Sequence, residues 1–252
     1  MRLTRQSRRQ PPVSRRLRLN FNVSPQSMST SSTSAEFSRL LKALADDVVY
    51  AHIHWRMALD IGTSLSEHPL VEAQSRTFWY LTHRAHVSTA LQHLCRAYDQ
   101  EQSSLHLLSW LRAIESNLTL FDVEAFRERL KSNAYVQSLS ESAAKPDPVA
   151  LATDIALSTA TDPLVRTLVA YRGSHAAHRS EKLARRDRGH SPSISDAEVE
   201  SLLSRSLDIL NRYSYTFAAE THSTSMVGRD DYKYIFKVVE ASVLQARGRD
   251  AG

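Results

Sequence analysis

The spacing of apolar residues constrains the fold of this chain more than any other feature of its sequence. From Phe37 to Leu59 apolar side chains recur every three or four residues, which is the period of one face of an α-helix. The same period continues through most of the remaining chain, and only six glycines interrupt it. The pattern predicts an all-α protein, an up-and-down helical bundle with short connections.

Local capping signals divide this pattern into separate helices. A helix break, an N-cap and a first-turn proline are all present in Lys145-Pro146-Asp147-Pro148. An N-cap followed by a first-turn proline occurs again at Asp162-Pro163. Ser195 and Glu198 have the spacing of a capping box. The predicted helices span roughly residues 35–62, 70–98, 105–114, 123–140 with Asp122 as N-cap, a stretch from 148, a stretch from 163 that carries Arg172, 195–221 and 231–246.

The first 34 residues differ from the rest in composition. They combine arginines, prolines and a Ser/Thr run with few apolar side chains, so we expect a disordered basic arm over 1–34 and a single helical domain over 35–247. The arm lacks the apolar core of a secretory signal. Three interpretations stay open: an RNA-contacting arm, a transit peptide, or an over-extended reading frame whose natural start is Met28.

Charge and cysteine usage narrow the class of protein. Residues 1–35 hold seven arginines and no acid, and the rest of the chain carries 25 Lys and Arg against 27 Asp and Glu. The net charge of +5 is therefore no evidence that the folded domain binds nucleic acid. No apolar run approaches the ~20 residues needed to span a membrane. A single cysteine, Cys95, excludes an internal disulfide, is expected to be a buried thiol, and suits the cytoplasm.

The candidate catalytic residues are Arg172 and His178. An arginine can hold a phosphate through two parallel donors, and a histidine can move a proton near neutral pH. Together they are the minimum set for metal-free cleavage of RNA. An arginine followed by a histidine after four to six intervening residues is also expected by chance, so the spacing alone carries no weight. The two other such pairs in the chain are Arg76 with His83 and Arg185 with His190.

The surroundings of this pair are strongly basic. Seven basic residues lie between positions 166 and 188, opposed by two acids, which indicates either a local anion site or a solvated basic helix end. On a straight helix Arg172 and His178 would lie about 120° apart, whereas His175 would lie about 60° from Arg172. The pair would converge only if the helix ended near His178 or if a second copy supplied half of the site. The accessory or RNA-binding candidates are Ser174, His175, Arg179, Lys182, Arg185 and Arg186.

Other histidines and aromatic residues have simpler interpretations. His83, His86 and His93 lie on one predicted helix and could bind a metal, but no acid accompanies them, and a polar face is favoured. We therefore predict no metal and no cofactor. His52 and His54 lie about 160° apart and cannot form one helical chelate. The cluster Phe78-Trp79-Tyr80, with Trp55 and Trp110, is predicted to be core rather than a stacking platform.

Several of these segments together resemble one family. The run from Arg172 to Arg179 on a late helix, the Trp55 region, Arg96-Ala97-Tyr98-Asp99 and Asp230-Asp231-Tyr232 are similar to the HEPN superfamily, in particular its AbiU-like abortive-infection branch, over about residues 36–246. The resemblance implies an all-helical, usually dimeric domain. It also implies metal-independent RNA cleavage in which Arg172 stabilises the phosphoryl charge and His178 transfers protons, leaving a 2′,3′-cyclic phosphate and a 5′-hydroxyl.

One position departs from the pattern of the family. Active members commonly carry Asn, Asp or His directly after the arginine, where this chain has Gly173. Either Ser174 or His175 takes over that role or the site is inert. A glycine weakens a helix by up to ~1 kcal/mol, so we expect that close packing or a particular backbone conformation requires a glycine at position 173.

Two main functions follow from these observations. The first is a HEPN-like metal-independent endoribonuclease of phage defence or of a toxin system, which cleaves RNA (tRNA is one candidate) as a homodimer under the control of an antitoxin or regulatory partner. The alternative is a non-catalytic helical module for dimerisation or for binding nucleic acid or protein. A purely structural scaffold is a third, weaker hypothesis. None of the three involves a membrane.

Overall fold

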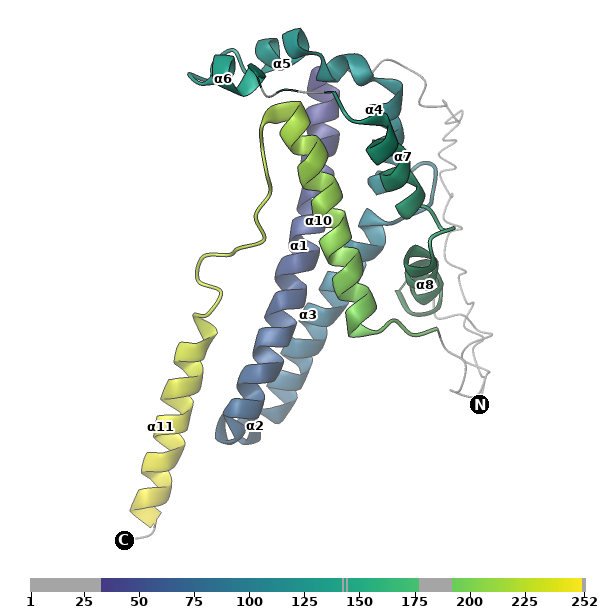
Figure 1. The fold of residues 1–252 in the computed structure, drawn as a ribbon. Coiled ribbons are helices and arrows are strands. Elements are labelled where there is room, and N and C mark those ends of the chain that lie inside the picture. Colours follow the sequence, from purple (N-terminus) through teal and green to yellow (C-terminus); the bar gives the residue numbers. More distant parts are fainter. Residues whose placement is uncertain (1–32, 142, 144, 177–191, 251–252) are drawn as a thin grey trace, which may run out of the picture. The chain divides into compact units, whose positions relative to one another are not determined.

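The computed structural model describes residues 33–141, 143, 145–176 and 192–250, and all regular structure in these ranges is helical. The prediction of an all-α bundle is therefore confirmed. The elements are α1 (Ser34–Glu67), α2 (Pro69–Gln74), α3 (Arg76–Ala97), α4 (Leu107–Ser116), η1 (Leu118–Phe121), α5 (Val123–Arg129), α6 (Val136–Glu141), α7 (Pro148–Leu157), α8 (Pro163–Tyr171), η2 (Arg172–Ala176), α10 (Asp196–Ala218) and α11 (Tyr232–Asp250) (Figure 1).

Helix α1 is longer than its sequence pattern predicts. It begins at Ser34, because Thr33 and Glu36 form a complete capping box, and it continues past Gly62 to Glu67. A Cβ at Gly62 would lie 3.7 Å from the His83 ring, so the glycine sits where α1 and α3 pack closely. The helix continues through this position although a glycine costs ~1 kcal/mol inside a helix.

Two predicted helices are interrupted in the structure. The predicted helix over 70–98 is α2 and α3, separated at Ser75, whose φ and ψ of −146° and 46° are not helical. The predicted helix over 123–140 is α5 and α6. Asp122 occupies the N-cap position of α5 as predicted, but its carboxylate makes no capping hydrogen bond and pairs with Lys145 Nζ at 2.6 Å. Both breaks were missed because neither Ser75 nor residues 130–135 include a proline or a glycine, the residues that mark a break in sequence.

The capping predictions for three helices are confirmed. Asp147 accepts the Val149 N–H at the start of α7, where Pro148 is the first helical residue. Asp162 does the same for α8, and Ser195 forms a capping box with Glu198 at the start of α10. Helix α10 ends at Ala218, three residues before the predicted end, because Ala219 adopts a left-handed conformation with φ of 53°.

The main core lies where α1, α3, α4 and α10 meet, and aromatic rings fill its centre. Phe37 of α1 lies 4.6 Å from Phe217 of α10 and 5.8 Å from Trp110 of α4, measured between ring centroids. Each such side chain, when fully buried, contributes about 1.5–3 kcal/mol through the apolar surface it removes from water. Long-range aromatic contacts therefore hold together helices that are far apart in sequence.

Helix α11 packs on a second, smaller apolar cluster. Phe236 is fully buried against Ile61, Val71 and Trp79. The Tyr232 hydroxyl and the Ser64 hydroxyl lie 3.0 Å apart, and Glu240 accepts a hydrogen bond of 2.9 Å from the imidazole of His68, next to α1. These contacts attach α11 to the end of α1 and to α2 and α3.

The basic arm over 1–34 falls almost wholly outside the described residues and remains a prediction, as does the single-domain boundary at 35–247. Of its residues, Thr33 and Ser34 are described, and they cap and begin α1. Within the described ranges no helix is both long enough and apolar enough to cross a membrane.

Candidate active site

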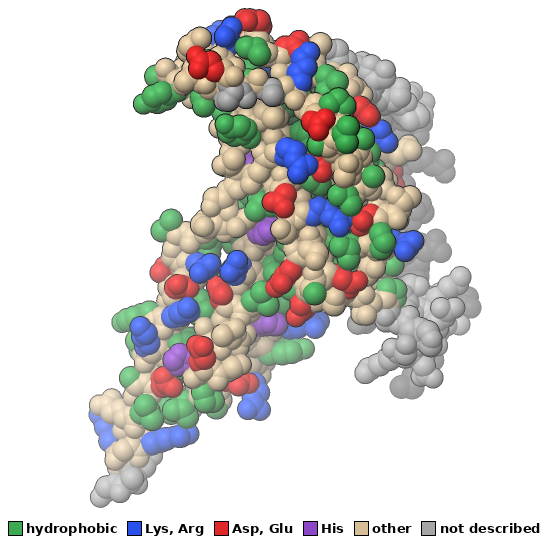
Figure 2. Space-filling view, viewed as in Figure 1, with side chains coloured by type: hydrophobic (Ala, Val, Ile, Leu, Met, Phe, Trp, Pro, Cys, Tyr) green, Lys and Arg blue, Asp and Glu red, His purple; other side chains and the backbone are tan. Residues whose placement is uncertain are grey.

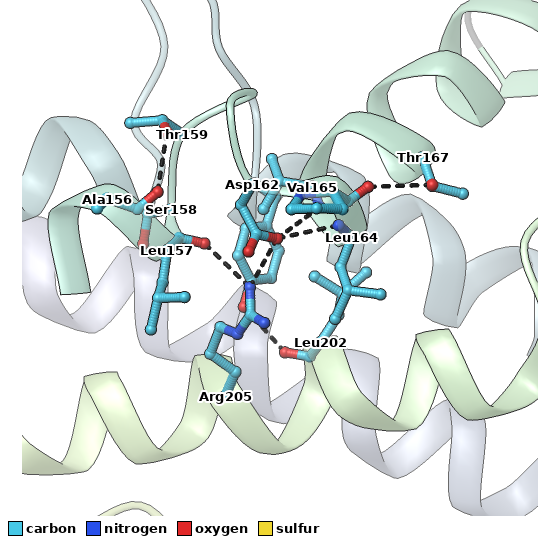
Figure 3. A network of polar contacts seen from close by, with 12 residues as sticks. Ala156, Leu157, Ser158, Thr159, Asp162, Leu164, Val165, Thr167, Leu202 and Arg205 are labelled. Atoms are coloured by element: carbon cyan, nitrogen blue, oxygen red, sulfur yellow. Dashed lines mark hydrogen bonds and ion pairs between the residues drawn. The ribbon is translucent and has the colours of Figure 1, made fainter. Parts of the chain in front are cut away.

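Helix α8, which leads to Arg172, is held at its N-terminus by a network of polar contacts around its N-cap, Asp162 (Figure 3). Asp162 accepts the N–H groups of Leu164 and Val165 at 3.0 and 3.1 Å. The same carboxylate oxygen accepts a hydrogen bond of 2.9 Å from Arg205 of α10, and Arg205 also donates to the Leu157 carbonyl. One carboxylate therefore both caps α8 and ties it to α10.

The backbone changes from α to π geometry at Arg172. The π-helical turn η2 comprises Arg172–Ala176, and such single turns often occur at functional sites. A π turn closes over five residues instead of four, so each residue rotates less about the axis. The rotation of 100° per residue that a regular α-helix would have therefore does not apply to Arg172–Ala176.

Arg172 forms an ion pair with Asp99, the residue that follows the C-cap of α3. Asp99 Oδ1 accepts from Arg172 Nη1 and also from the backbone N–H of Gln100 at 2.8 Å and of Glu101 at 3.2 Å. The Asp99 side chain is 10% exposed and that of Arg172 is 37% exposed. The Arg172 side chain is thus held by Asp99 and is still partly exposed.

The charge state of Asp99 follows from these contacts. Burial alone would raise the pKa of the carboxyl, but the hydrogen bonds from Arg172, Gln100 and Glu101 outweigh it and hold the pKa below its usual value. Asp99 is therefore an anion at neutral pH. An anion with fixed backbone donors is a stable anchor for a guanidinium.

The loop that carries Asp99 is attached to the turn before α8. The Gln100 side-chain amide donates to the carbonyls of Tyr98 and Ser158 at 2.9 and 3.1 Å. Its oxygen accepts the Ala160 N–H at 3.1 Å. Gln100 thus joins the end of α3 to the α7–α8 connection, which keeps Asp99 opposite Arg172.

Gly173 does not have the packing role that we expected from its sequence. A Cβ built at this position meets no described atom within 4 Å, and its φ lies outside the left-handed region. The expectation of a packing or backbone need is wrong as far as the described residues show. The neighbouring Ser174 hydroxyl bonds back to its own helix, at 2.9 Å from the Ala170 carbonyl.

Most of the other predicted site residues lie outside the described residues. His178, Arg179, Lys182, Arg185 and Arg186 are in this group, and for His175 only the backbone, in η2, is described. The structure therefore brings together Arg172 and Asp99, and the placement of His178 remains a prediction. Asp99 was missed as a partner because nothing in the sequence links two residues 73 positions apart.

Cys95 lies one turn before Asp99 and is buried, as expected. Burial raises the pKa of its thiol to about 11, and the nearby Arg172 offsets this only in part. The side chain is therefore a neutral thiol at physiological pH. A thiol in this state is a poor nucleophile.

Two of the three histidines of α3 make polar contacts with residues of α1. His86 Nδ1 lies 2.8 Å from His54 Nδ1, and His93 Nδ1 lies 2.7 Å from Asp47 Oδ1. No aspartate or glutamate accompanies these histidines within α3 itself, but Asp47 of α1 contacts His93. The described residues contain no group of three or more potential ligands placed to hold a metal ion.

The predictions for the remaining histidines and aromatic residues have mixed outcomes. His52 bonds to the Leu203 carbonyl at 2.8 Å while His54 meets His86, so the two diverge as predicted. The three tryptophans are buried, which confirms that they are core. Phe78 and Tyr80 are 59% and 60% exposed, so their assignment to the core is wrong.

The helical bundle and a match to a family model assign the chain to a known class of protein domain. An all-helical bundle with an arginine at the end of a late helix has the architecture of a HEPN-type domain. The chain belongs to the HEPN-type abortive-infection family AbiU2, whose family model matches residues 34–235. The matched range includes both Asp99 and Arg172. The searches of curated proteins and of solved structures gave no match.

Proposed function

We propose that this protein is a metal-independent endoribonuclease of the HEPN type that acts in abortive infection. The observation that carries the proposal is the ion pair of Arg172 with Asp99, which orients the guanidinium of a side chain that is 37% exposed. A fixed and accessible arginine is suited to bind a phosphate diester and to stabilise the charge that develops on its oxygens.

The reaction would be an in-line transfer within RNA. The 2′-oxygen attacks the neighbouring phosphorus, a P–O2′ bond forms and the P–O5′ bond breaks. His178 takes the 2′-hydroxyl proton or gives a proton to the departing 5′-oxygen, while a second group completes the exchange. The products are a 2′,3′-cyclic phosphate and a 5′-hydroxyl, and neither an oxidant nor a metal is needed for the atoms to balance.

The quaternary arrangement is part of the proposal. A second copy related by a two-fold axis would place two arginine and histidine sets near one strand of RNA, and could supply the second proton-transfer group. We therefore propose a homodimer that acts on RNA, with tRNA as a first substrate to test. An antitoxin or regulatory partner would restrain the enzyme, since uncontrolled cleavage would arrest growth.

The test is cleavage of labelled tRNA and of total cellular RNA by the purified full-length protein, with and without EDTA. The proposal expects EDTA-resistant cleavage with cyclic phosphate ends. Arg172→Ala and His178→Ala should each lower the rate at least about 100-fold, as loss of one transition-state donor does elsewhere. Arg112→Ala, a change at an exposed arginine of α4, is the control. Cleavage that EDTA abolishes would refute the metal-independent mechanism.

A non-catalytic binding module is the alternative, and exposed apolar side chains favour it. Tyr234 and Ile235 of α11 are 73% and 51% exposed, and Phe78 and Leu81 of α3 are 59% and 58% exposed. Surfaces of this kind bind proteins. This alternative predicts dimerisation or capture of a partner without cleavage of any RNA, and Arg172→Ala would leave that binding unchanged.

A further inference from the structure

Helix α3 differs in charge from the helices around it. Its 22 residues include Arg76, Arg84 and Arg96 and three histidines, and they include no aspartate or glutamate. Helices α1 and α10 carry both signs of charge, and on the face seen in Figure 2 acidic and basic side chains are interspersed. A helix without acids beside a proposed phosphate site would attract a polyanion.

The outer side of α3 forms a continuous exposed stripe. Its members follow each other at spacings of three or four residues and therefore share one face of the helix. At a rise of 1.5 Å per residue the stripe is about 27 Å long. It consists of Phe78, Leu81, Ala85, Ser88, Gln92 and Arg96, all of which are exposed.

Two arginines flank the small residues of this stripe. Arg84 is exposed, forms no ion pair with any described residue, and lies close enough to Tyr171 to lower the pKa of its hydroxyl against the larger effect of burial. Arg96 is 57% exposed, and its Nε is held 3.0 Å from Asp47 Oδ1. The neutral residues between them, Ala85 and Ser88, would let a polymer backbone approach closely.

The stripe has an aromatic ring at one end and the candidate active site at the other. Phe78 is 59% exposed at the start of α3, where a base could stack on it. Arg96 lies in the last turn of α3, and the N–H of Asp99, the partner of Arg172, donates to its carbonyl at 3.2 Å. Cations interleaved with an exposed ring are typical of surfaces that bind single-stranded nucleic acid.

We infer that this stripe of α3 binds the single-stranded RNA that leads into the Arg172 site. Arg84 and Arg96 hold phosphates, and Phe78 stacks on a base farther along the strand. The inference rests on the proposed function, because it assigns the substrate path of the same site. Asp47 of α1 pairs with Arg96, but α3 itself carries no acid and Arg84 pairs with no described acid. This charge and the continuity with Arg172 favour RNA over a protein as the occupant.

The test uses the full-length His178→Ala protein and a fluorescein-labelled 20-nucleotide oligouridine, with binding measured over a range of salt concentrations. Arg84→Gln with Arg96→Gln should weaken binding at least tenfold and lower the salt slope by about 1.4, or 0.7 for each phosphate that is no longer neutralised. Arg84→Lys with Arg96→Lys should retain the slope. Phe78→Ala should weaken binding about fivefold or more with the slope unchanged.

Arg112→Gln is the matched control, because Arg112 is also 57% exposed but lies on α4. Thermal melting of each variant verifies that it is folded. If the wild-type protein cleaves RNA and the double glutamine variant binds and cleaves with unchanged affinity, the inference is wrong while the proposed function stands. If the wild-type protein neither binds nor cleaves RNA, both are wrong. If the variant loses only self-association, the stripe is a protein interface.

Discussion

Arg172 at the end of α8 forms an ion pair with Asp99 at the end of α3, across 73 positions of sequence. The pair joins the segment that carries the candidate catalytic arginine to a carboxylate that is itself held by two backbone N–H groups. An arginine fixed in this way loses little further freedom when it binds a phosphate, which is the advantage of preorganisation.

Asp99→Asn should lower the rate of RNA cleavage about 100-fold, because a misplaced guanidinium no longer meets the phosphate in the productive geometry. Single-turnover cleavage measures the effect. Asp99 positions Arg172 and moves no proton, so the pH of half-maximal rate should stay the same. Asp122→Asn, which removes an exposed ion pair with Lys145, should have no effect on cleavage. A shifted pH profile in Asp99→Asn would argue against a positioning role.

Gly173→Asn should be tolerated by the fold, since a Cβ at this position meets no described atom within 4 Å. Replacing a helical glycine removes backbone freedom from the unfolded chain and should leave the melting temperature unchanged or raise it. If the glycine limits catalysis, the asparagine should also raise the cleavage rate. Gly173→Ala separates the two effects, because it changes the backbone freedom without adding a polar group. A large drop in melting temperature for both Gly173→Asn and Gly173→Ala would contradict the finding that there is room for a side chain at this position.

Asp162→Ala should destabilise the protein more than Asp162→Asn. Alanine removes both the cap of α8 and the partner of Arg205, whereas asparagine still accepts the N–H groups of Leu164 and Val165. Loss of a cap alone costs about 0.5–2 kcal/mol in the free energy of unfolding. Denaturant titration would measure the difference, and equal losses in the two variants would show that the cap contributes nothing.

Stability should fall as the pH decreases below about 6.5, the ordinary pKa of histidine. Burial lowers the pKa of His106, against smaller opposing effects of the Glu101 carbonyl and Asp99, so the folded protein keeps the ring neutral while the unfolded chain binds a proton. The unfolded state gains more protons in this range, and the free energy of unfolding therefore rises with pH. The other histidines whose pKa values are lowered, chiefly by burial, are His52, His54, His86 and His222.

His106→Asn isolates one part of this dependence. The ring caps α4 by accepting the Ser109 N–H at 3.3 Å, and asparagine can also cap a helix but does not titrate. The variant should show a shallower loss of stability between pH 6.5 and lower pH, measured by urea unfolding across that range. An unchanged slope would exclude His106 as a contributor.

Sequence alone predicted those elements whose signals are local. The starts of α7, α8 and α10 follow from Asp147, Asp162 and Ser195, each of which bonds to an N–H within three residues. The break at Ser75 and the continuation of α1 through Gly62 were not predictable, because they depend on how neighbouring helices pack. The same limit applies to Phe78 and Tyr80, which are aromatic like Trp79 but are exposed where Trp79 is buried.

By itself the sequence determined the all-helical class and the caps of α7, α8 and α10, since helical periodicity and capping act within a few residues. Arg172 became a candidate through its basic surroundings and the resemblance of its segment to the HEPN superfamily. Only the tertiary structure decided that Asp99 holds Arg172 and that Asp47 of α1 lies between His93 and Arg96 of α3. Ion pairs of this kind depend on which helices pack side by side. That packing is set by the burial of many side chains together, and no single stretch of sequence records it.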